Sequence, residues 1–139
     1  NFNLIMKWVR SKIPFPFKPE RNRRSLVFLD NLVSLIITCI NHPNAANNIF
    51  LVSDDEDLST AELIRRIAKS MNVRYLMLPL PTAIIKLAAS SIGKGAVAQR
   101  LFDNLQVNIE NTKTKLDWKP PFSVDQGLKQ TINNFQLKD

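Results

Sequence analysis

The sequence predicts an α/β fold of mixed short strands and helices, alternating along 139 residues. Apolar residues make up 45% of the chain, which is enough for one domain with its own core. Two S-x-x-E/Q capping boxes, starting at Ser59 and Ser123, each precede a stretch with apolar residues at helical spacing. The alternation and the two boxes together favour helices packed on strands.

The helices are predicted from apolar spacing and from their end signals. Asp30 is expected to cap the second helix, and Gly93 to end the fourth in a left-handed conformation. The last helix places Val124, Leu128, Ile132 and Phe135 on one face. The expected helices are residues 1–13, 30–41, 60–71, 82–92, 96–104 and 124–135.

Four short apolar runs predict strands, at residues 25–29, 49–53, 74–79 and 105–109. In the first run, "SLVFL", both faces are apolar, so this strand is expected to be buried on both sides. Arg23 and Arg24 directly precede it and should point to opposite sides. Only one of the two arginines is therefore expected to face a given ligand.

The net charge is +7, and seven of the 19 basic residues precede Ser25, where only Glu20 opposes them. Such a patch attracts nucleic acid, a membrane surface or a phosphorylated small molecule, unless it is a solvated face. No apolar run approaches the ~20 residues that span a membrane. Arginine offers a planar fork of donors that matches phosphate oxygens, so Arg23, Arg24 and Arg100 are the candidate anion contacts.

Catalytic and metal-binding motifs are missing from the sequence. It has no G-x-G-x-x-G, no P-loop, no CxxC and no HExxH. His42 lies in a loop before Pro43, and the acidic run at residues 54–57 is read as negative charge before a helix. The single cysteine, Cys39, sits in an apolar run and is read as core, in keeping with a reducing compartment. A complete active site is not expected.

Three stretches resemble the C-terminal half of extended short-chain dehydrogenase/reductases: "NRRSLVFLDNLVSLIITCINHP", "NIFLVSDDEDLSTAELIRRIA" and "KLDWKPPFSVDQGLKQTI". The most specific parts are the Arg-x6-Asp-x-Leu segment that begins at Arg23 and the Leu116-x-Trp118-x-Pro120 ending. The resemblance covers nearly the whole chain. It points to the UDP-glucose 4-epimerase-like, NAD-dependent epimerase/dehydratase group of bacterial surface-polysaccharide synthesis.

This resemblance implies that residues 1–139 are the nucleotide-sugar-binding portion of an extended Rossmann-type enzyme. The chain also opens on a helix without an initiator Met, which suggests part of something longer. An N-terminal Rossmann domain would hold NAD and the Tyr-x-x-x-Lys catalytic pair, and residues 49–53 would supply a late strand of its sheet. By the resemblance, Arg23 and Arg100 contact the UDP phosphates, Asn1 and Phe2 meet the nucleotide through their backbone, and Phe17 lies beside uracil.

The resemblance further implies a UDP-sugar substrate, NAD as an internal hydride carrier, a cytoplasmic location and a homodimeric parent. It implies no nucleic-acid or membrane partner, and no catalysis by these residues alone. Lys18 and Asp117 stand where glycines are usual, so the turns there are expected to differ. A dehydratase, decarboxylase or reductase of the same group is the alternative. Outside it, a basic nucleic-acid-binding module and a non-catalytic scaffold remain open.

Overall fold

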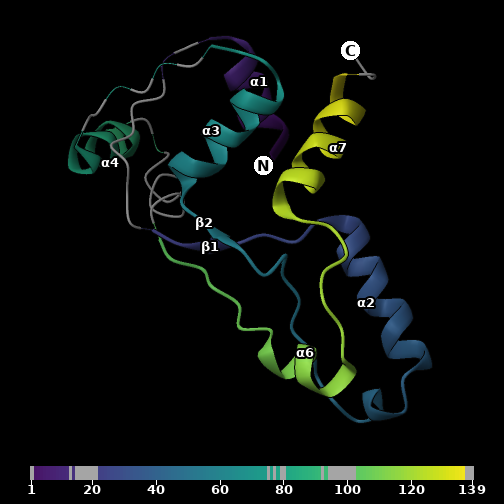
Figure 1. Cartoon of the computed structure of the whole chain (residues 1–139). Coiled ribbons are helices and arrows are strands. Elements are labelled where there is room, and N and C mark those ends of the chain that lie inside the picture. The colour runs from purple at the N-terminus through teal and green to yellow at the C-terminus, as the bar shows by residue number, and fades with distance from the viewer. Residues whose placement is uncertain are drawn as a thin grey trace.

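The computed structural model describes residues 2–12, 14, 22–74, 76, 78, 81–91, 93 and 103–136 (Figure 1). It combines helices with a short sheet, which confirms the mixed α/β class. The helices are α1 (Phe2–Arg10), α2 (Leu29–Asn41), α3 (Thr60–Ser70), α4 (Thr82–Ser91), α6 (Glu110–Leu116) and α7 (Val124–Gln136), with a 3₁₀ turn η1 (Pro43–Ala45). The strands are β1 (Arg24–Ser25) and β2 (Asp57–Leu58).

The sheet lies at the centre of the molecule, with helices above and below it in Figure 1. β1 pairs antiparallel with β2, so that Arg24 lies opposite Leu58. On its other side β1 forms a parallel bridge to Leu105, because the amide of Ser25 donates to the Leu105 carbonyl at 2.8 Å. The start of β1 is therefore held from both sides.

One core, which we call the closed core, lies between α1, α3 and α7. α3 contributes Ile64 and Ile67, both fully buried, and α7 contributes Ile132 at 1% exposure. The predicted inward faces of these two helices are confirmed. The closed core comprises Met6, Val9, Leu58, Ile64, Ile67, Ala68, Met71, Val124, Leu128 and Ile132.

Both capping boxes are present. Ser59 Oγ accepts from the Glu62 amide at 3.1 Å, and Ser123 Oγ accepts from the Gln126 amide at 3.3 Å. Asp30 as the cap of α2 was wrong, because the helix begins at Leu29 with Phe28 as its N-cap, two residues before the predicted cap. Asp30 lies in the first turn, where its negative charge still suits the helix dipole.

A second, smaller cluster joins α2 to α6 and Trp118. Leu35 and Trp118 are buried there, and the indole Nε1 of Trp118 donates to Ser34 Oγ at 3.2 Å. Asp117 adopts the left-handed conformation, with φ of 46°, so it keeps the backbone that a glycine would favour. Cys39 is half-buried and packs against this cluster, in agreement with its interpretation as a core residue.

The predicted strands are mostly not strands in the structure. Of residues 25–29 only Ser25 pairs, and Val27 and Leu29 are 45% and 67% exposed, so burial on both sides was wrong. Residues 49–53 and 106–109 form no strand in the described chain. The described positions of 74–79 also carry no strand assignment, and the rest of that run lies outside the described residues.

The predicted helices differ mainly at their ends. The first ends at Arg10 because Lys12 turns to φ of 57°, and Ile13 lies outside the described residues. The fourth, α4, is followed by Gly93 with φ of +71°, as expected. Most of residues 96–104 lies outside the described residues. None of the described helices is long and apolar enough to cross a membrane.

Candidate functional site

Arg23 is fixed by its backbone at the junction of three segments. Its amide donates to Asn104 Oδ1 at 2.7 Å, and its carbonyl accepts from the Leu105 amide at 2.9 Å. The next residue, Arg24, begins β1. A side chain on such a backbone starts from a defined position, which limits the entropy lost when it binds a ligand.

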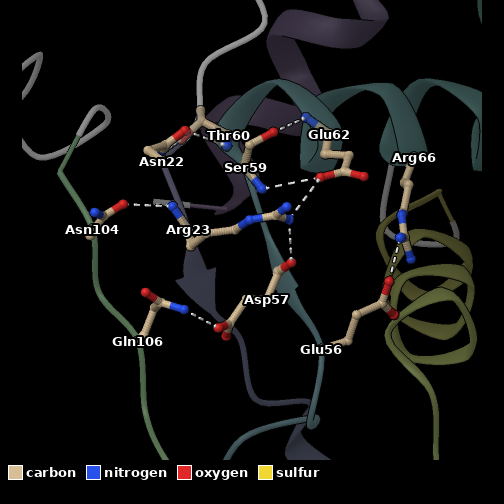
Figure 2. Close-up of polar contacts among 10 residues, drawn as sticks. All are labelled: Asn22, Arg23, Glu56, Asp57, Ser59, Thr60, Glu62, Arg66, Asn104 and Gln106. Carbon is tan, nitrogen blue, oxygen red and sulfur yellow. Dashed lines mark hydrogen bonds and ion pairs between the residues drawn. The ribbon is translucent and has the colours of Figure 1, made fainter.

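The Arg23 side chain lies between β2 and the start of α3 (Figure 2). Its Nη1 donates to the Asp57 carbonyl at 3.3 Å and lies 3.7 Å from Glu62 Oε2. The side chain is 55% exposed. Its Nε and Nη2 have no partner among the residues that the structure describes. The guanidinium is thus oriented by one edge while its other donors face solvent.

The Asp57 carboxylate fixes the strand that supplies this carbonyl. It accepts from Ser25 Oγ through one oxygen and from Gln106 Nε2 at 2.6 Å through the other (Figure 2 shows the second bond). Ser25 Oγ in turn accepts from the Val107 amide at 2.8 Å. These bonds tie β1, β2 and residues 105–107 into one platform beneath Arg23.

Glu62 has two roles in this cluster. Within the capping box it accepts from the Ser59 amide at 3.4 Å, and it also faces Arg23. Beside it, Asn22 Nδ2 donates to Thr60 Oγ1 at 3.1 Å, which anchors the chain before Arg23 to the start of α3. The ion pair of Arg23 is long and half-exposed, so it contributes at most about 1 kcal/mol. A charged hydrogen bond to phosphate, at roughly 1.5–3 kcal/mol, can outweigh it.

The acidic run at residues 54–57 is not simply negative charge before α3, since each acid has its own partner. Asp55 binds Lys113 Nζ at 2.9 Å, and Glu56 binds Arg66. The hydrogen bonds that Arg66 donates to Glu56 and Asp125 raise the pKa of Arg66. No group of three or more potential ligands that could hold a metal ion occurs among the described residues. The acids of this run therefore tie their segment to several neighbouring elements, and only Asp57 contacts Arg23.

Phe2 lies elsewhere, in a pocket of about 500 Å³ between the start of α1, residues 26–30 and α7. Arg23 does not line this pocket, so the structure does not bring the two predicted contacts into one cavity. The other predicted contacts, Asn1, Phe17 and Arg100, lie outside the described residues. Their roles stay predictions.

Asn31 and Asp54 form a buried polar pair at the back of this pocket. Asn31 is fully buried, and its Nδ2 donates to Asp54 Oδ1 at 2.7 Å and to the Phe122 carbonyl at 2.8 Å. Asp54 Oδ1 also accepts from the Phe28 amide at 2.8 Å. The pair thereby fixes where α2 begins and where the chain enters α7.

Sequence reasoning found Arg23 but missed the residues that orient it, namely Asp57, Glu62, Asn104 and Gln106. Their partners come from segments 34 to 81 residues away, so no local spacing could indicate them. Glu62 was recognisable only as part of a capping box. The described arrangement offers oriented cationic donors, which suits the binding of an anion.

Comparison with known proteins agrees with the motifs. The chain is 46% identical over 136 residues to a protein named UDP-glucose 4-epimerase from Vibrio cholerae. It is similar to an epimerase. The match covers 97% of this chain, which confirms the resemblance to the UDP-glucose 4-epimerase-like group, but only 42% of that protein, so the chain spans less than half the length of this relative. No protein-family model and no solved structure matches the chain.

Proposed function

We propose that this chain is the UDP-sugar-binding part of an NAD-dependent nucleotide-sugar epimerase that resembles UDP-glucose 4-epimerase. The observation that carries the proposal is 46% identity over 97% of the chain, with Arg23 of the matched motif held rigid and half-exposed. The parent enzyme would act in the cytoplasm, in surface-polysaccharide synthesis. A dehydratase, decarboxylase or reductase acting on a nucleotide-sugar is the alternative.

In this proposal Arg23 holds the diphosphate through the donors that face solvent. The diphosphate is remote from the reacting sugar carbon, so its binding energy can position the sugar without taking part in the reaction. Arg100, Asn1, Phe2 and Phe17 would complete the nucleotide site.

The described residues of this chain do not fit an NAD site. A dinucleotide turn needs glycines between a strand and the N-terminus of a helix. Gly127 instead lies inside α7, where a Cβ would come within 2.8 Å of Phe28 Cγ, and Gly93 follows a helix end. We therefore place NAD, the catalytic pair and any homodimer contact through Rossmann helices in a further part of the enzyme.

The test uses a chimera in which this chain replaces the matched 42% of the Vibrio cholerae protein. UDP is titrated into the chimera by calorimetry. Arg23→Ala should weaken UDP binding roughly 10- to 100-fold, the equivalent of one charged hydrogen bond. The neighbouring Arg24→Ala removes the same charge from a residue that strand alternation is expected to turn the other way, so it is the matched control and should cost much less.

Equal losses in the two variants would contradict the site, since a diffuse basic surface does not distinguish neighbouring arginines. Arg100→Ala tests the second predicted phosphate contact in the same way. The unaltered chimera should epimerise UDP-sugar, whereas the 139 residues alone should not. Salt-steep binding of an oligonucleotide without any response to UDP would instead favour the nucleic-acid module.

A further inference from the structure

The pocket of about 500 Å³ that contains Phe2 has an acidic lining in a positively charged chain. It lies between the start of α1, residues 26–30 and α7, which Figure 1 shows. Asp30 and Asp54 line it, and none of its described lining residues is a lysine, arginine or histidine. The whole chain carries 19 basic and 12 acidic side chains, so the pocket reverses the overall balance. A pocket of this size and sign suits a small cationic ligand rather than an anion.

Asp54 contributes a buried carboxylate to this lining. Only 8% of the residue is exposed. Its Oδ1 accepts from the Phe28 amide at 2.8 Å and from Asn31 Nδ2 at 2.7 Å, whereas its Oδ2 has no partner among the described residues. Both donors are neutral. A buried charge is normally paired, because the hydration that it loses must be replaced. Oδ2 is therefore the open position for a cationic donor.

The Asp54 carboxylate is held in a fixed place by bonds that leave Oδ2 unused. The amide of Asp54 donates to the Leu26 carbonyl at 2.8 Å. Asn31, which binds Oδ1, is itself bound to Phe122 twice, since it accepts from the Phe122 amide at 2.9 Å and donates to the Phe122 carbonyl at 2.8 Å. A carboxylate that is oriented before a ligand arrives loses little entropy when the ligand binds.

Much of the remaining lining is apolar. Val124 and Leu128 of α7 are buried there at 2% and 6% exposure, and Phe2 and Phe28 contribute aromatic rings. Such walls accommodate the apolar body of a ligand, and an aromatic ring also attracts a cation. The polar lining residues besides the two acids are Asn3, Gln130, Thr131 and Asn134. The pocket thus combines apolar walls with one buried acidic group.

We propose that this pocket binds a small organic ammonium ion, that is, a protonated primary amine on an apolar body. The ammonium group donates to Asp54 Oδ2, and the exposed carboxylate of Asp30 adds attraction from the surface. Arg23 does not line the pocket, so the site is separate from the candidate phosphate contact and does not rest on the proposed function. Phe2 meets the nucleotide, by the resemblance, through its backbone, which leaves its ring to this pocket.

Two probes of similar shape test the charge requirement. Cyclohexylammonium and its neutral counterpart cyclohexanol are titrated separately into the 139-residue chain and into the chimera defined above, and amide chemical shifts are followed by NMR. Cyclohexylammonium should bind at least about 10-fold more tightly than cyclohexanol, because only the former can pair with a carboxylate. The amides of Phe28, Asp54 and Gly127, which lie at the pocket, should shift.

Asp54→Asn removes the charge and keeps an oxygen that can accept from Phe28 and Asn31. It should weaken cyclohexylammonium binding at least about 10-fold and leave cyclohexanol binding unchanged. Asp55→Asn is the matched control, because it removes the same charge from the next residue, which lies outside the pocket and pairs with Lys113. Its effect should stay below about 2-fold.

A melting curve establishes whether Asp54→Asn folds. If it does not, Asp30→Lys takes its place, because Asp30 is exposed and has no partner among the described residues. The added positive charge should weaken cyclohexylammonium binding about 5-fold or more and leave cyclohexanol binding unchanged.

Equal affinities for the two probes would overturn the proposal, since the apolar walls alone would then account for binding. Equal losses in Asp54→Asn and Asp55→Asn would do the same. Binding by the chain but not by the chimera would also overturn it, because the further part of the enzyme would then fill the pocket. Loss of UDP binding in Arg23→Ala, with cyclohexylammonium binding retained, is the expected result for two separate sites.

Discussion

The closed core and helix α2 follow different rules of burial within one chain. In α3 the apolar residues are restricted to one face, and Arg65, Arg66 and Lys69 occupy the outer surface. In α2 no such division exists, and Ile40 is 74% exposed. The apolar face of α3 is therefore buried within this chain, whereas much of the apolar surface of α2 is exposed. The arrangement of apolar residues around a helix, more than their number, distinguishes the two cases.

The largest expected effect compares one isoleucine from each region. Ile64→Ala removes a fully buried side chain between α1, α3 and α7, and should lower the free energy of unfolding by about 2–5 kcal/mol. Ile40→Ala removes an exposed side chain and should change it by less than about 0.5 kcal/mol. Urea denaturation of the 139-residue chain measures both.

Similar costs for the two substitutions would break the comparison, since Ile40 would then already be buried in the free chain. In the chimera the stability costs of the two substitutions should become more alike. If α2 packs against the further part of the enzyme, Ile40→Ala becomes a core truncation and its cost should rise by about 1 kcal/mol or more.

The closed core was predictable from sequence because its information is local. Capping boxes and 3.6-residue spacing placed α3 and α7 and named Ile64, Ile67 and Ile132 before any contact was known. Strand pairing was not predictable in the same way. Residues 49–53 have a strand-like sequence but no strand beside them in the described chain, and pairing depends on that partner.

The candidate site was likewise only partly predictable from the sequence. The position of Arg23 before the apolar run was predictable from its motif. Its orientation depends on Glu62, Asn104 and the Asp57 carbonyl, which reach it only through the tertiary fold. Asp30 was misassigned because an acid near a helix start suits both the cap and the first turn.

An intermediate effect is expected where the two regions meet. Gly127 of α7 lets the Phe28 ring approach, and an added Cβ would lie 2.8 Å from its Cγ and 2.9 Å from its Cβ. Alanine would gain about 1 kcal/mol of helix propensity. The clash involves the rigid base of the ring rather than a flexible tip, so it should prevail, with a net loss of about 1–2 kcal/mol of stability.

A double-mutant cycle with Phe28→Ala isolates this contact. In the Phe28→Ala background the clash is absent, so Gly127→Ala should become neutral or stabilising. Thermal denaturation of the four proteins measures the coupling. If Gly127→Ala destabilises both backgrounds equally, the close approach of α7 to residue 28 is not what requires glycine there.

The smallest expected effect concerns Arg66 and Lys113, two cations that form ion pairs with the acidic run at residues 54–57. Arg66 of α3 stays charged at any working pH, but Lys113 of α6 titrates. The hydrogen bonds that Lys113 donates to Glu110 and Asp55 raise the pKa of Lys113 above its ordinary 10.5. The folded state therefore holds this proton more tightly than the unfolded state does. The resulting stability is fully present below pH 10.5 and is lost as pH rises through the higher folded pKa.

Lys113→Met should thus lower the melting temperature slightly at neutral pH and reduce its fall above pH 10.5. Lys129→Met is the control, because this exposed lysine of α7 forms no ion pair among the described residues. Identical pH profiles for the two variants would mean that the contacts of Lys113 with Asp55 and Glu110 contribute nothing to folding.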